Sequence, residues 1–230
     1  RYVTVEKYLD LITRKALFFT RLAHTGDPFE GSYPRLNVKA RDNRYPDLGE
    51  EQKRLVAAQL EDLARKARWW IMVNCWHASD VESAAMWDLY APRGGSVALK
   101  SSIRRLRAVL PKQYVQISDV NYINYETESF KDIFLESAAI HKRKSFEHEH
   151  EVRAFVSELG SVDGKEYVTK GIMPDDGGRF ITADPSVLID EVRIAPFTQS
   201  WIRELVEYLT NREGFGFRIV QSDMEAEPLF

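Results

Sequence analysis

Short helical patterns alternate with short β-rich runs along the whole chain, and this alternation limits the folds open to it. Apolar residues recur at helical spacing near the start, at Val5, Leu9, Ile12 and Ala16, and residues 17–22 then form a β-rich run. The same order returns at residues 50–77 and 198–222. We also expect Thr4 to cap the first helix, a helix over residues 129–143, strands over 96–101 and 187–196, and a hairpin or flap formed by 166–170 and 178–182. No glycine-rich phosphate loop follows an expected strand, which argues against P-loop and Rossmann folds. We therefore predict a single α+β domain over residues 1–230, with a mixed, mainly antiparallel sheet flanked by helices.

Charge and cysteine content exclude several classes of protein. Lys and Arg number 32 against 35 Asp and Glu, which does not suggest a general nucleic-acid or membrane-surface binder. Cys75 is the single cysteine, so an internal disulfide framework and a cysteine-rich zinc site are excluded. With no apolar run long enough for a membrane span, we expect a cytoplasmic protein. The chain begins at Arg1 rather than Met, and we expect preceding sequence in the full protein.

Ionisable side chains are concentrated in the segment "KSFEHEHEVRAF", residues 144–155. We predict a strand here, from Glu149 onward. Alternation would place the acidic residues and an arginine on one face, namely Glu147, Glu149, Glu151 and Arg153, and His148, His150 and Val152 on the other. Carboxylates crowded in this way repel unless a cation or a proton answers them, which is a reason to suspect a site at Glu149 and Glu151. A solvated edge strand is the alternative.

The histidine pair in the same segment suggests a different chemistry. An H-x-H pattern on a strand directs two imidazoles the same way, which suits zinc or manganese if a third ligand converges. Candidates for that ligand are His24, Asp27, His77 and His141. The sequence contains no second metal motif, so we predict no metal site.

Three further positions are candidates for ligand binding. Glu30 lies in the loop sequence "GDPFEG", where it is predicted to line a pocket mouth, whereas Asp27 before Pro28 is typical of a structural turn. His77 ends an expected strand, and Tyr90 ends an expected helix, where its ring could floor a pocket.

Several motifs together resemble an uncharacterised bacterial family known only as a domain of unknown function. They are "ALFFTR", "GDPFEG", "CWH", "MWDLY", "GGSVALKS", "SFEHEHEVRA" and "VRIAPFTQSW", in this order along nearly the whole chain. The layout of an early arginine and a later E-x-E also resembles the ADP-ribosyltransferase fold. This second resemblance implies NAD as co-substrate, with Arg1 binding NAD, Glu151 catalytic and Glu149 positioning the acceptor. Tyr90 would then stack on nicotinamide. The Ser-Thr-Ser motif of the arginine class is not present.

Three functions follow from these observations. The first is an NAD-dependent ADP-ribosyltransferase or NAD glycohydrolase, as in a bacterial toxin or phage-defence effector, acting on a small nucleotide with a protein or nucleic-acid acceptor. The second is a metal-dependent hydrolase or nuclease that uses His148 and His150. The third is a non-enzymatic binding or sensor domain, in which Glu149 and Glu151 form ion pairs with Arg153, Arg143 or Lys144.

Overall fold

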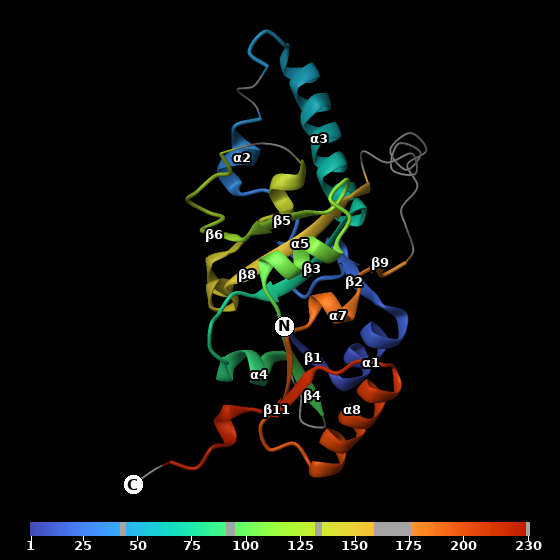
Figure 1. Ribbon diagram of the computed structural model, residues 1–230. Coiled ribbons are helices and arrows are strands. Elements are labelled where there is room, and N and C mark those ends of the chain that lie inside the picture. Colours follow the sequence, from blue (N-terminus) through green and yellow to red (C-terminus); the bar gives the residue numbers. More distant parts are fainter. Residues whose placement is uncertain (42–44, 91–94, 132–134, 159–175, 229–230) are drawn as a thin grey trace. The chain divides into compact units, whose positions relative to one another are not determined.

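The computed structural model describes all residues except 42–44, 91–94, 132–134, 159–175 and 229–230 (Figure 1). The chain forms two compact units. The first contains Arg1–Phe18, Cys75–Gln113 and Phe180–Phe230, and the second contains Phe19–Asn74 and Tyr114–Arg179. Three of the four boundaries between the units fall inside strands, namely β2, β3 and β9.

A four-stranded sheet forms the centre of the first unit, in the order β1-β4-β10-β11. Strand β4 pairs antiparallel with both β1 and β10, and β10 pairs parallel with β11. The strands are β1 (Tyr2–Thr4), β4 (Ser96–Lys100), β10 (Glu191–Ile194) and β11 (Arg218–Gln221). The helices are α1 (Val5–Arg14), α4 (Ala84–Tyr90), α5 (Ile103–Val109), α7 (Pro185–Leu188), α8 (Ser200–Arg212) and the 3₁₀ turn η5 (Asp223–Glu225).

Helix α1 shows how the sequence sets local structure in this unit. The Thr4 hydroxyl accepts a hydrogen bond from the amide of Lys7 at 3.5 Å, and Lys15 ends the helix in the left-handed conformation at φ 53°. The apolar face of α1 lies against α8 (Figure 1), where the hydroxyls of Tyr8 and Thr210 are 2.6 Å apart. Both side chains are buried, so this hydrogen bond joins the two helices inside the core.

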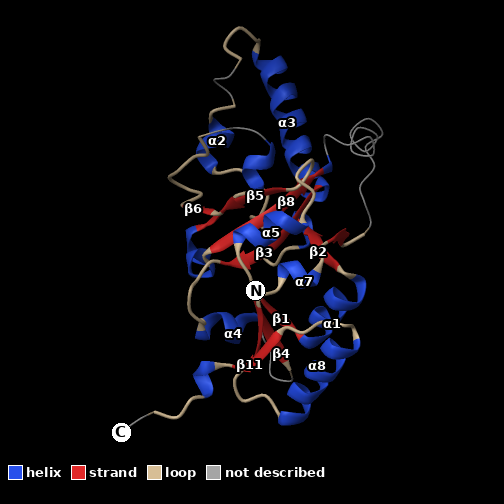
Figure 2. Cartoon of the chain, in the orientation of Figure 1, coloured by secondary structure: helices blue, strands red, loops and turns tan. Residues whose placement is uncertain are grey.

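The second unit is built on a five-stranded sheet in the order β5-β8-β3-β2-β9, of which β5, β8, β3 and β2 are labelled in Figure 2. Strands β6 and β7 form a separate parallel pair. The strands are β2 (Ala16–Arg21), β3 (Ile71–His77), β5 (Gln116–Asp119), β6 (Asn121–Ile123), β7 (His141–Arg143), β8 (Glu151–Ser157) and β9 (Gly178–Thr182). The α-helices are α2 (Arg35–Lys39) and α3 (Glu50–Trp70), and the 3₁₀ helices are η1 (Leu22–His24), η2 (Leu135–Ala139) and η3 (Lys144–Glu149). Strands β2 and β3, and likewise β5 and β8, are antiparallel.

The predicted α+β class with a mainly antiparallel sheet is confirmed. Two local predictions are wrong. Residues 129–143, predicted as one helix, contain the 3₁₀ helix η2 and then strand β7. The strand predicted at residues 187–196 begins only at Glu191, because Asp184 caps the short helix α7 through the amide of Ser186 at 2.8 Å. Part of the predicted hairpin, residues 166–170, lies outside the described residues.

Candidate functional site

The acidic segment changes conformation in its middle. Residues Lys144–Glu149 form η3, His150 adopts the left-handed conformation at φ 40°, and β8 begins at Glu151. The strand predicted to start at Glu149 is therefore two residues shorter at this end. Since a single left-handed residue redirects the chain, simple alternation does not hold across it. Glu147 and His148 are exposed, whereas Glu149 is buried.

Five charged side chains meet behind this segment and form a buried ionic cluster. Its members are Glu30, Lys142, Glu149, Glu151 and Arg153, and none of their side chains is more than 7% exposed. The Lys142 ammonium contacts all three carboxylates, at 3.2 Å from Glu30, 2.8 Å from Glu151, and in a shorter contact with Glu149. Arg153 donates to Glu151 at 2.5 Å and to Glu30 at 2.8 Å. Buried charges of this kind persist only when they are paired, and here each is paired.

Backbone groups complete the cluster. The third nitrogen of Arg153 donates to the carbonyl oxygen of Ala139 at 2.8 Å, and the amide of Glu151 donates to the hydroxyl oxygen of Tyr122 at 2.8 Å. Burial raises the pKa of Tyr122 to about 12, so this phenol stays neutral at physiological pH. Ala139 of η2 and Tyr122 of β6 thus hold Arg153 and Glu151, the two charged residues of β8 in the cluster, through hydrogen bonds.

Electrostatics within the cluster keep Glu151 ionised. Burial alone would raise the pKa of Glu151, but the charge of Arg153, the side-chain interactions with Glu149 and Arg153, and the charge of Lys142 together hold this pKa well below its usual range. Burial would lower the pKa of Lys142, yet the charges of Glu151 and Glu30 and its hydrogen bonds raise it instead. Lys142 is therefore a fixed cation rather than a proton donor.

Glu149 and Glu151 share one cation, because both of their carboxyl groups contact the Lys142 ammonium. The cluster as a whole contains three carboxyl groups and two cations. Carboxyl groups crowded in this way interact strongly, so the ionisation of each depends on the others.

Glu30 reaches the cluster from the "GDPFEG" loop. It was predicted to line a pocket mouth, but its side chain is only 2% exposed, because two cations hold it inside. Its Oε2 atom is buried and has no hydrogen-bond partner among the described residues. Asp27 is the turn residue that the sequence predicts. Its carboxylate accepts from the amide of Phe29 at 3.0 Å and from two nitrogens of Arg143 at 2.7 and 3.1 Å.

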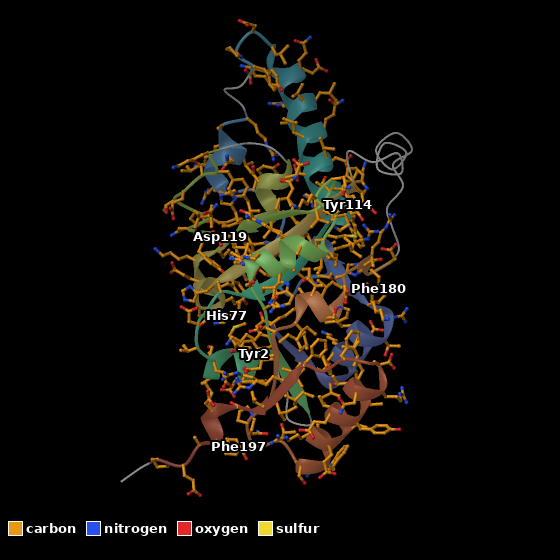
Figure 3. The ribbon with its side chains drawn as sticks, viewed as in Figure 1. Tyr2, His77, Tyr114, Asp119, Phe180 and Phe197 are labelled. Carbon is orange, nitrogen blue, oxygen red and sulfur yellow. The ribbon has the colours of Figure 1, made fainter. Side chains whose placement is uncertain are left out.

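The remaining predicted cofactor residues belong to the first unit. The Arg1 guanidinium lies over the Trp76 ring at 5.7 Å, and the His77 ring meets the Tyr2 ring edge-on at 6.1 Å (Figure 3). Tyr90, the last residue of α4, is 42% exposed. Among the predicted residues, the structure thus brings together Glu30, Glu149 and Glu151 in the second unit.

The histidine pair is not built as a metal site. His148 and His150 were predicted to share a face with Val152, and this prediction is wrong. Both histidines are exposed whereas Val152 is buried, because the chain turns at His150, which is left-handed, before strand β8 begins. Within the described ranges, no group of three or more His, Cys, Asp or Glu side chains is arranged to hold a metal ion.

Lys142 is the member of the cluster that sequence reasoning missed. It stands between His141 and Arg143 in a polar run that has no apolar signal of burial. The signal that could have found Lys142 is chemical. Acidic residues crowded in one segment need a cation if they are buried, and a neighbouring strand is where that cation can come from. Lys142, which lies on strand β7 seven residues before Glu149, supplies this cation.

A family model described as "Protein of unknown function (DUF2971)" matches residues 86–154. This span covers less than half of the chain and includes four members of the ionic cluster, with Glu30 outside it. The "MWDLY" and E-x-E-x-R motifs fall inside the span, whereas "GDPFEG" precedes it. No curated protein and no solved structure matches the chain. In the part of the chain that the structure describes, no helix is long and apolar enough to cross a bilayer.

Proposed function

We propose that this protein cleaves the N-glycosidic bond of NAD, acting as an ADP-ribosyltransferase or an NAD glycohydrolase. The observation that supports this most is that two carboxyl groups, those of Glu149 and Glu151, lie together on the Lys142 ammonium, with Glu151 kept ionised. A pair of carboxyl groups is the usual means of cleaving a glycosidic bond. The E-x-E resemblance selects the same two residues.

In this proposal Glu151 stabilises the charge that develops on the ribose. The bond between the nicotinamide nitrogen and ribose C1′ breaks, its electron pair passes to the ring nitrogen, and nicotinamide leaves as a neutral molecule. Positive charge then spreads over C1′ and the ring oxygen, where a nearby carboxylate stabilises it. Water or an acceptor hydroxyl attacks C1′ and loses its proton to a carboxylate. Glu149 is the residue that orients this acceptor.

A second function is favoured by the closure of the cluster. Glu151 pairs with Arg153, as expected for a non-enzymatic binding domain, and every member is at least nine-tenths buried. In that case the cluster is an internal scaffold that holds the "GDPFEG" loop against β8. Activity and scaffolding predict opposite results in one assay.

The experiment is nicotinamide release from NAD, measured by mass spectrometry on the wild-type chain and on Glu151→Gln. Glutamine keeps the size of glutamate and its hydrogen-bonding oxygen but cannot carry the negative charge. Glu147→Gln is the matched control, because Glu147 is an exposed glutamate in the same segment. We expect release by the wild type and by Glu147→Gln, and a loss of about 100-fold or more in Glu151→Gln.

Melting temperatures of the three proteins separate lost chemistry from lost folding. Glu151→Gln that stays folded at the assay temperature but releases no nicotinamide supports the transferase proposal. A wild-type chain that releases none, and whose melting temperature NAD does not raise, refutes it and supports the scaffold. Arg1→Ala and Tyr90→Ala, tested for the NAD-induced rise in melting temperature, examine the binding roles that the resemblance implies.

A further inference from the structure

Helix α8 carries a row of exposed apolar side chains on the side away from its buried face. Ile202, Val206 and Thr210 are buried against the first unit, whereas Trp201, Leu205 and Tyr208 are 56%, 37% and 64% exposed. Arg212 continues the row, with 60% of its side chain exposed. These residues are spaced by four, three and four positions, so they form one ridge along the helix.

A further exposed aromatic residue lies just before the helix, four positions before Trp201. Phe197 is 81% exposed and adopts φ 58°, a backbone conformation that is uncommon outside glycine (Figure 3). Its amide donates to a Glu225 carboxylate oxygen at 3.1 Å, which holds the conformation. The Trp201 indole is also oriented, since its N–H donates to Gln199 at 2.5 Å. Both rings are therefore presented to solvent in defined positions.

We infer that this ridge is a dimerisation surface whose occupant is α8 of a second copy of the chain, packed antiparallel. The four-three-four spacing is palindromic about a point between Val206 and Glu207. In an antiparallel pair this symmetry places Leu205 opposite Tyr208 of the second copy, and Trp201 opposite its Arg212. The pair is thus isologous, with each contact made twice. A guanidinium over an indole is a favourable cation–π arrangement, because tryptophan is the best ring for one.

The size of the ridge agrees with a dimer at the small end of specific interfaces. An aromatic side chain has roughly 150–250 Å² to bury, and the exposed fractions are 81%, 56% and 64% for Phe197, Trp201 and Tyr208. With Leu205 and Arg212, each copy removes roughly 500 Å² from water, or about 1,000 Å² for the pair, which is the lower limit for a specific interface. Association at micromolar concentrations is the expected consequence.

Sedimentation velocity from about 1 to about 200 µM protein tests this inference, since small interfaces associate in that range. We expect the mean mass to rise above 26.6 kDa in the wild type, and the dissociation constant to increase at least tenfold in Trp201→Ala and in Tyr208→Ala. Alanine suits an exposed helical position, so both variants should fold. Val81→Ala is the control, because Val81 is a 75% exposed apolar residue of the same unit outside the ridge, and it should leave the association unchanged.

The antiparallel register has its own test. Chains carrying Leu205→Cys and chains carrying Tyr208→Cys, mixed and oxidised, should form a disulfide-linked dimer in higher yield than either variant alone. The wild type, with Cys75 as its single cysteine, gives the background. A chain that remains monomeric at all concentrations refutes the inference. So does a dimer that both alanine variants leave intact, because it would use another surface or another partner site.

Discussion

Replacing Lys142 by methionine removes the positive charge at the centre of the ionic cluster while keeping a side chain of similar length. Lys142 contacts Glu30 at 3.2 Å, Glu151 at 2.8 Å, and Glu149, with 6% of its own side chain exposed. Removing one partner of a buried ion pair destabilises a protein by about 3–5 kcal/mol, since the remaining charge is buried and unpaired. Because three carboxyl groups lose this partner, we expect the upper part of that range near pH 7. A loss of this size is a large share of a typical stability of about 5–15 kcal/mol.

The effect should depend on pH in a definite direction. Although burial would raise the pKa of Glu151, the charges of Arg153 and Lys142 hold this pKa below its usual range in the wild type. The stabilisation that comes from ionised Glu151 is therefore present above the unfolded-state pKa of about 4.3, and it is lost as the pH falls through the folded-state pKa. Without Lys142 the buried carboxylates repel one another and take up protons at higher pH. Acidification from about pH 7 to about pH 5 therefore reduces the repulsion between carboxylates in the variant but not in the wild type. The difference between their free energies of unfolding should shrink by about 1 kcal/mol or more.

Urea denaturation at both pH values measures this difference, and Lys144→Met is the matched control. Lys144 is an exposed lysine two positions away, and its replacement should change the free energy of unfolding by less than about 0.5 kcal/mol. If Lys142→Met has no larger effect than Lys144→Met, the cluster does not stabilise the second unit. If its effect is the same at both pH values, the carboxylates are not the groups that Lys142 stabilises.

Two further predictions concern local packing. The Thr210 hydroxyl donates to the carbonyl of Val206 at 2.6 Å, so Tyr8 is the donor of their shared hydrogen bond. Tyr8→Phe should therefore lower the free energy of unfolding by about 1 kcal/mol, measured by urea denaturation. Burial raises the pKa of Tyr8 to about 12, so its contribution is present below about pH 10 and is lost above it. An unchanged alkaline transition in the variant would contradict this. Gly31→Ala should lower stability by about 1–3 kcal/mol, because Gly31 has φ 75° and an added Cβ would lie 2.7 Å from the Cγ of Arg68. A melting temperature equal to that of the wild type would show that this loop relaxes freely.

Local pattern was sufficient for much of the architecture. The Thr4 cap and apolar spacing of α1, the long helix α3, the amphipathic helix α8 and strands β2, β3, β4 and β11 were all expected from the spacing and propensity of residues close together in the sequence. The sequence also indicated that Glu149, Glu151 and Arg153 act together. Their common environment was expected from strand alternation, and Glu149 reaches it by another route, through the 3₁₀ turn and the left-handed His150.

Only the tertiary structure decided which groups neutralise these carboxylates. Glu30 lies more than a hundred residues before Glu151, and Lys142 stands on a different strand, so no local pattern links them. The exposure of the ridge on α8 was also decided by the tertiary structure. A helical pattern distinguishes the faces of a helix, but it does not show which side chains the core will cover. The sequence by itself determined most of the elements, since these depend largely on short-range propensity and spacing. The pairing of buried charges depended on the fold, because each charge can enter the interior only when a partner from a distant segment arrives with it.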